Sequence, residues 1–185
     1  MKNQRGISFI ELIFALSVAG VLVSAAVPSF LGSIRNSDMA SSANSLVGAV
    51  HAARAEAVKT RSRVTMCRGD RSGENPTCDA DGFDLLVFVN DSNDASYDSG
   101  DVLVRASSWL KEDMTVSSND IPDYVTFNSR GVTEDTNGDS ISGTALLCGP
   151  SGEKHARIIT LSPTGRPTVQ HHRDATNPAA CPTTT

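Results

Sequence analysis

A long apolar segment precedes a polar body in this chain. Between Arg5 and Arg35 only Glu11 carries a charge. Because a helix rises about 1.5 Å per residue, about 20 apolar residues cross the hydrocarbon core of a bilayer. Residues 7–31 are therefore predicted to form a transmembrane helix. Lys2 and Arg5 precede this segment, and their charge predicts a cytoplasmic N-terminus, with the rest of the chain on the far side of the membrane.

Apolar positions recur at helical spacing after the first segment. They follow one another at intervals of three or four residues, which places them on one face of a helix: Met39, Ala43, Leu46, Val50, Ala53 and Ala57. Residues 32–62 are therefore assigned to an amphipathic helix, and its last helical turn is expected near residue 60. We call these six residues the small-residue stripe, and we expect it to pack closely against a sheet.

Beyond this helix the chain changes to short β-rich runs separated by Gly, Asn, Asp, Ser and Pro. Strands that follow one another without intervening helices pair antiparallel, which predicts an α+β domain over residues 63–174. Residues 175–185 are interpreted as a tail. The expected strands cover residues 63–68, 82–90, 101–106, 114–117, 124–128, 144–148, 157–162 and 168–171.

Composition limits the functions that this chain can have. Its 185 residues and 19.5 kDa suffice for one ordinary domain, not for a multi-domain enzyme. The chain has 16 basic and 21 acidic side chains and a net charge of −5, which argues against a basic nucleic-acid-binding domain. We find no serine nucleophile elbow, phosphate-binding glycine loop or HExxH zinc motif. We therefore predict neither an enzyme nor a cofactor.

Glu11 is the unusual residue of the apolar segment. A carboxylate inside a membrane costs a few kcal/mol, so it is expected to have a partner. No basic residue lies on the adjacent helical turns. A cut after Gly6 would create a new ammonium group on Ile7, which could pair with Glu11 of a neighbouring subunit.

The segment RGISFIELI, which starts at Arg5, resembles the processing signature of type IV prepilins and type II secretion pseudopilins. This resemblance implies that a prepilin peptidase cuts after Gly6 on the cytoplasmic face and methylates Ile7. It also implies that Glu11 serves filament assembly. The family usually has Phe and often Thr at the first two mature positions, where this chain has Ile7 and Ser8.

Three further segments narrow the resemblance: LVGAVHAARAEAVKTRSRVTMC from Leu46, GFDLLVFVNDSNDASYDSGDVLVRAS from Gly82, and ARIITLSPTGRP from Ala156. Together they resemble the GspH/FimT family of minor pilins and minor pseudopilins. The resemblance implies a long N-terminal helix on small antiparallel sheets, in a subunit of low copy number near the filament tip. Pro28 matches the proline at which pilin helices commonly kink.

A cleaved secretory signal peptide is an alternative for the apolar segment. A stretch of small residues with Ala-Ala-Val-Pro ends at Pro28, and cleavage after Ala26 would release a secreted protein beginning at Val27. Signal peptides have shorter apolar cores and rarely tolerate an acid in them. Glu11 therefore favours the pilin interpretation.

The four cysteines allow three disulfide pairings. Translocation would place all of them in the periplasm, where disulfides form and persist. We favour Cys67–Cys78, which would close a local loop, and Cys148–Cys181, which would tether the tail. A metal site is the alternative, but no CxxC or close Cys/His pair supplies the ligand spacing.

Two acidic loops could offer oxygen ligands to calcium, but neither completes the regular calcium-loop pattern. Solvated turns between strands are the favoured interpretation, and we predict no metal site. The first loop contains Asp91, Asn93, Asp94, Asp98 and Asp101, and the second contains Glu134, Asp135, Asn137 and Asp139.

Basic residues gather near the C-terminal end despite the acidic average. Some FimT-type pilins, which this chain resembles, bind DNA through a Gly-Arg-x-Arg motif. Here the motif reads Gly165-Arg166-Pro167-Thr168, so only the first arginine is present. Candidate DNA contacts are Arg166, Arg173 and Lys154. So few cations favour a turn arginine over a DNA site.

The resemblance implies a minor pilin of a type IV pilus, assembled at or near the tip and supporting pilus biogenesis, adhesion or motility. The alternatives are a GspH-like minor pseudopilin of a type II secretion system and a DNA-binding competence pilin. The implied partners are other pilins through the N-terminal helix, the prepilin peptidase, the assembly platform and the inner membrane. The expected domains are a leader (1–6), the membrane helix, the amphipathic helix, a periplasmic head and the tail. After assembly the subunit would lie in a fimbrium or pseudopilus.

Overall fold

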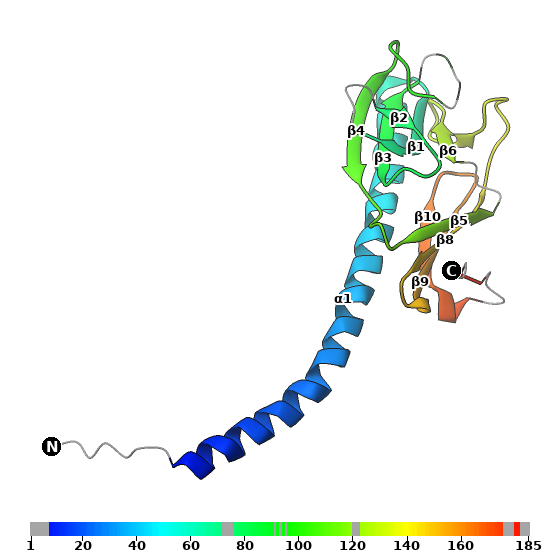
Figure 1. The fold of residues 1–185 in the computed structure, drawn as a ribbon. Coiled ribbons are helices and arrows are strands. Elements are labelled where there is room, and N and C mark those ends of the chain that lie inside the picture. Colours follow the sequence, from blue (N-terminus) through cyan, green and yellow to red (C-terminus); the bar gives the residue numbers. More distant parts are fainter. Residues whose placement is uncertain are drawn as a thin grey trace. The chain divides into compact units, whose positions relative to one another are not determined.

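The computed structural model describes residues 8–71, 76–90, 92, 94, 96–119, 123–175, 180 and 181. The chain divides into two compact units, Met1–Ser37 and Asp38–Thr185. A helix, α1 (Phe9–Thr60), belongs to the first unit at its beginning and to the second at its end, and the labelled strands belong to the second unit (Figure 1).

The end of α1 agrees with the sequence prediction. Thr60 Oγ1 donates a hydrogen bond of 2.8 Å to the carbonyl oxygen of Glu56 in the last turn. Arg61 follows with a φ of 56°, in the left-handed conformation that commonly ends a helix.

Among the described residues, no helix combines the length and the apolarity needed to cross a membrane.

All six residues of the small-residue stripe are buried, with exposures between 0% and 8%. Ala49, on the same face, is also fully buried. Side chains as small as alanine let a helix axis lie close to the layer that it covers. The predicted helical face is therefore confirmed as the face that packs on the core of the second unit.

The first sheet is antiparallel and has the strand order β4-β3-β1-β6-β7, with β2 paired to β1. β1 lies at its centre, and its first four residues are all buried, so it shows no alternation of exposed and buried positions. The strands are β1 (Val64–Asp70), β2 (Thr77–Cys78), β3 (Asp84–Val89), β4 (Val102–Ser108), β6 (Tyr124–Phe127) and β7 (Thr133–Glu134).

The second sheet has the order β10-β9-β8-β5 and is also antiparallel. It leads into a short 3-10 turn, η1 (His172–Asp174). Its strands are β5 (Thr115–Asn119), β8 (Gly143–Gly149), β9 (Gly152–Leu161) and β10 (Pro167–His171). The eight strands expected from the sequence are present with shifted ends, whereas β2 and β7 were not expected.

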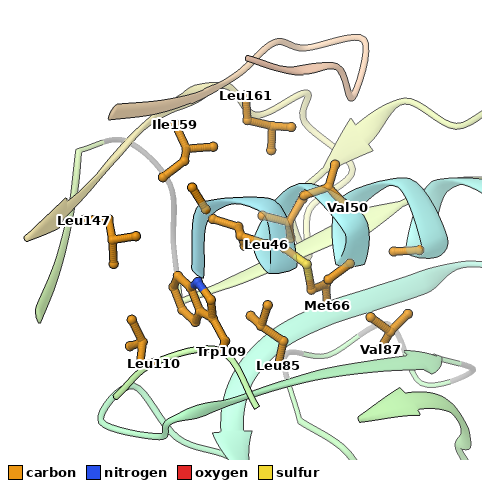
Figure 2. Close-up of a cluster of buried hydrophobic side chains, with 14 of the residues drawn as sticks. Leu46, Val50, Met66, Leu85, Val87, Trp109, Leu110, Leu147, Ile159 and Leu161 are labelled. Atoms are coloured by element: carbon orange, nitrogen blue, oxygen red, sulfur yellow. The ribbon is translucent and has the colours of Figure 1, made fainter. Parts of the chain in front are cut away.

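The core of the second unit lies where α1 meets both sheets. Figure 2 shows Leu46 of α1 among side chains of both sheets, with Met66 and Leu85 on one side and Ile159 on the other. Trp109, just after β4, belongs to the same cluster and is 5% exposed. The α+β architecture expected from the sequence is confirmed.

Candidate functional site

The first unit presents a helix whose apolar side chains are exposed. None of the described residues from 8 to 37 is buried. Exposed apolar side chains that gather along one helix mark an interaction surface. We call the following exposed side chains the apolar surface: Phe9, Ile10, Leu12, Ile13, Phe14, Leu16, Val18, Val21, Leu22, Val23, Val27, Phe30, Leu31 and Ile34.

Glu11 lies in the first turn of α1 and is exposed. The first helical hydrogen bond joins the N–H of Leu12 to the carbonyl oxygen of Ser8, at 3.1 Å. An acidic side chain in this turn is stabilised by the partial positive charge of the helix N-terminus. The predicted cleavage and methylation positions, Gly6 and Ile7, lie outside the described residues.

Hydroxyl groups within the apolar surface bond to the helix itself. Ser17 Oγ donates to the carbonyl oxygen of Ile13, and Ser24 Oγ donates to that of Val21, both at 2.8 Å. Pro28 also lies within α1, and because proline has no N–H, one helical hydrogen bond is absent there. With these hydroxyls satisfied internally, Glu11 is the charged side chain that this surface presents.

The structure contains two disulfides, in the pairing favoured from the sequence. Cys67–Cys78 joins β1 to β2, with 5.7 Å between the Cα atoms. Cys148–Cys181 joins β8 to the C-terminal segment, with 5.9 Å between the Cα atoms. Cys67 and Cys148 are buried, so both bridges attach peripheral segments to a sheet.

The candidate DNA contacts are divided between two ends of the second sheet. In the β9–β10 ladder, Pro167 pairs with Leu161 and His171 pairs with Arg157. Arg166 therefore precedes one end of the ladder, whereas Arg173 and Lys154 lie beyond the other. The length of β10 corresponds to about 17 Å. The register thus does not bring the three side chains together.

The second acidic loop forms a turn that satisfies its own carboxylate. Asp135 Oδ1 accepts the backbone N–H groups of Asn137 at 2.8 Å and Asp139 at 2.9 Å. These hydrogen bonds, that from Asp139 foremost, lower the pKa of Asp135. No cluster of three or more potential metal-ligating side chains occurs within the described part of the chain.

The sequence did not indicate a polar groove of about 640 Å³ at the end of α1. The residues that line it come from separate segments and form no motif, so no pattern along the chain could reveal it. They are Arg61, Ser62, Arg63, Asn90, Asn128, Ser129, Arg130 and Glu134, and we call this site the arginine groove.

Two protein-family models match this chain. A model of the prokaryotic N-terminal methylation motif matches residues 1–27, a range that includes Gly6, Ile7 and Glu11. The family described as type II transport protein GspH matches residues 42–165. The chain belongs to the GspH family. A search of curated proteins found no match.

Two solved structures share the fold of this GspH-family chain. Both are crystal structures of the type IV minor pilin FimU from Pseudomonas aeruginosa, in different crystal forms. For the first, the TM-score is 0.57 at 19% identity, and the match covers 78% of this chain and 96% of the chain in that crystal structure. For the second, the TM-score is 0.55 at 19% identity, and the match covers 75% of this chain and 97% of the chain in that crystal structure.

These matches confirm the predicted membership of the pilin-like superfamily and the pilin-like α+β fold. Pilins and pseudopilins are structural subunits that assemble with one another, which also confirms that this GspH-family chain is not an enzyme.

Proposed function

We propose that this GspH-family chain is a minor pilin of a type IV pilus that assembles at or near the filament tip. The observation that carries the proposal is the apolar surface of the first unit. Its apolar side chains are exposed in the isolated chain, whereas the second unit has its own buried core. In a filament, the helices of neighbouring subunits would cover this surface, and before assembly a lipid bilayer would do so.

The methylation motif supports a defined route to the filament. In this proposal the prepilin peptidase removes residues 1–6 and methylates Ile7 at the cytoplasmic face of the inner membrane. Residues 7–31 anchor the subunit, residues 32–62 carry the amphipathic helix, and residues 63–174 form the periplasmic head. Residues 175–185 form a tail tethered by Cys181. The assembly platform then moves the helix from lipid into the filament, where Glu11 pairs with the N-terminus of a neighbour.

A minor pseudopilin of a type II secretion system is the second candidate, because the GspH family is described as type II transport proteins. The likeness to the minor pilin FimU favours the pilus. DNA contact by Arg166, Arg173 and Lys154 is not part of the proposal, because the β9–β10 register separates them.

Deletion of the gene in its own host tests the choice of machine. We expect fewer surface pili and weaker twitching motility, both restored by the wild-type chain, with normal release of proteins secreted by the type II pathway. Loss of that secretion with unchanged piliation would instead assign the chain to the secretion apparatus. N-terminal sequencing tests the route separately, because prepilin processing yields a chain beginning at Ile7 and signal peptidase one beginning near Val27.

A further inference from the structure

The arginine groove brings three guanidinium groups to one place on a chain that is acidic overall. Arg61 and Arg63 lie on the short connection between α1 and β1, and Arg130 lies in the turn between β6 and β7. Cations near the end of α1 complement the partial negative charge of the helix C-terminus. That effect accounts for Arg61 and Arg63, but not for Arg130, which comes from a different segment.

The side-chain oxygens of Glu134 and Asn128, in the wall of the groove, already accept hydrogen bonds from neighbouring groups. Glu134 Oε1 accepts a hydrogen bond from Arg63 Nε at 2.8 Å, and Glu134 Oε2 accepts one from Asn128 Nδ2 at 3.0 Å. Asn128 Oδ1 accepts the backbone N–H groups of Arg130 at 3.0 Å and Val132 at 3.2 Å. The carboxylate and amide oxygens therefore hold the wall together, and the guanidinium groups are the charged groups that the groove presents to a ligand.

The cationic donors of the groove remain available to a ligand. Within the described part of the chain, the exposed guanidinium groups of Arg61 and Arg130 form no side-chain hydrogen bond or ion pair. Arg63 uses Nε for Glu134, and its side chain is 47% exposed. Three arginines against one glutamate leave two unbalanced positive charges, and no aromatic ring among the lining residues could stack on a nucleobase.

The turn that carries Arg130 is fixed by close packing. Gly131 has a φ of 74°, and a Cβ atom there would lie 3.0 Å from Arg54 Nε and 3.1 Å from a methyl carbon of Val58. On its other side, a Cβ atom on Gly165 would lie 2.9 Å from the carbonyl oxygen of Gly131. The turn is thus held between α1 and the loop after β9, which positions one wall of the groove.

We propose that the arginine groove binds an oxyanion of the phosphate type with at least two negative charges. Guanidinium groups bind phosphate oxygens through paired N–H donors, and such a ligand needs no acceptor from the wall. A volume of about 640 Å³ lies within the usual range of ligand pockets and admits two linked phosphoryl groups. The oxyanion is met either as a free small molecule or as part of a polyphosphate chain.

Calorimetric titration of the full-length chain in non-ionic detergent at low ionic strength tests this site, with sodium pyrophosphate as the probe. We expect saturable binding that weakens as sodium chloride is added. The double variant Arg61→Asn, Arg130→Gln should bind at least about tenfold more weakly, because two charge-assisted contacts are lost. Asparagine suits position 61 because it tolerates positive φ.

A charge-matched control separates the groove from general attraction of anions. The double variant Lys154→Gln, Arg173→Gln also removes two positive charges, but neither residue lines the groove, so its affinity should equal that of the wild type. No pyrophosphate binding by the folded wild type, or equal weakening in both variants, would overturn the proposal. If the groove variant does not fold, Arg130→Gln alone, in an exposed turn, supplies the comparison.

A second titration, with medium-chain polyphosphate, distinguishes the two sources of the oxyanion. If a polyphosphate molecule binds more tightly than pyrophosphate, and the groove substitutions weaken that binding, the result supports a polymer as the source. Equal affinities for the two probes support a free small anion. Binding of duplex DNA without binding of pyrophosphate would overturn the proposal, because the groove would then not recognise an isolated oxyanion.

Discussion

Ser42 Oγ donates a hydrogen bond of 2.8 Å to the carbonyl oxygen of Trp109, 67 residues further along the chain. Ser42 is 5% exposed on α1, and Trp109 follows the edge strand β4. Ser42 Oγ also lies 3.4 Å from Met114 Sδ. This one hydroxyl therefore joins the helix to the segment that connects the two sheets.

Ser42→Ala should lower the free energy of unfolding of the second unit by about 1–2 kcal/mol, because a buried carbonyl loses its partner. Chemical denaturation of the full-length chain measures the change. Ser41→Ala is the control, since Ser41 is exposed on the same helix and alanine there gains only helix propensity. Equal effects of the two substitutions would show that the Ser42–Trp109 hydrogen bond adds nothing.

Glu11→Ala should leave membrane insertion and prepilin cleavage intact but reduce incorporation into filaments. The substitution keeps the apolar surface and removes the charge proposed to pair with a neighbour's N-terminus. The amount of the chain in sheared filaments, relative to membranes, measures incorporation. Ser17→Ala, which removes only a hydroxyl bonded within the helix, should incorporate normally. Normal incorporation of Glu11→Ala would count against an assembly role for this carboxylate.

Removal of the two disulfides should destabilise the second unit to different degrees. Cys148 and Cys181 are 33 residues apart, whereas Cys67 and Cys78 are 11 apart. Closing a longer loop removes more conformational entropy from the unfolded chain. The chain-entropy account therefore assigns about 3.7 kcal/mol of stabilisation to Cys148–Cys181 and about 2.8 kcal/mol to Cys67–Cys78. Denaturation of the two double-alanine variants checks the order, and a larger loss for Cys67–Cys78 would contradict the loop-length argument.

Gly131→Ala should destabilise the second unit more than Gly138→Ala. Both glycines have positive φ, 74° and 87°, so alanine at either position costs about 1–2 kcal/mol. A Cβ atom at Gly131 would also crowd Arg54 and Val58, whereas nothing lies within 4 Å of one at Gly138. Thermal unfolding compares the two, and an equal loss would mean that Arg54 and Val58 adjust without cost.

Residues with a repeating environment could be predicted from the sequence. The small-residue stripe repeats every three or four positions because one helical face contacts the same core, and all six residues are buried. The longer strands were found because each covers several β-rich residues. β2 and β7 have two residues each, too few for any period, and exist because longer neighbours provide an edge for pairing.

Charge clusters were harder to predict, because distance along the chain differs from distance in space. Lys154, Arg166 and Arg173 are close in sequence, yet the antiparallel ladder places Arg166 at the opposite end from the other two. Arg61 and Arg130 are far apart in sequence, yet they line one groove. Only the sheet order, with β6 beside β1, brings these two arginines together.

The short connection between α1 and β1 has a mechanical consequence for a filament subunit. α1 ends at Thr60 and β1 begins at Val64, in the middle of the first sheet, where β3 and β6 flank it. Tension applied to the helix must first separate the small-residue stripe from the core before it acts on β1. It must then break the hydrogen bonds that join β1 to the strands on both sides. The central strand of the first sheet therefore helps the head to stay attached to its helix under tension.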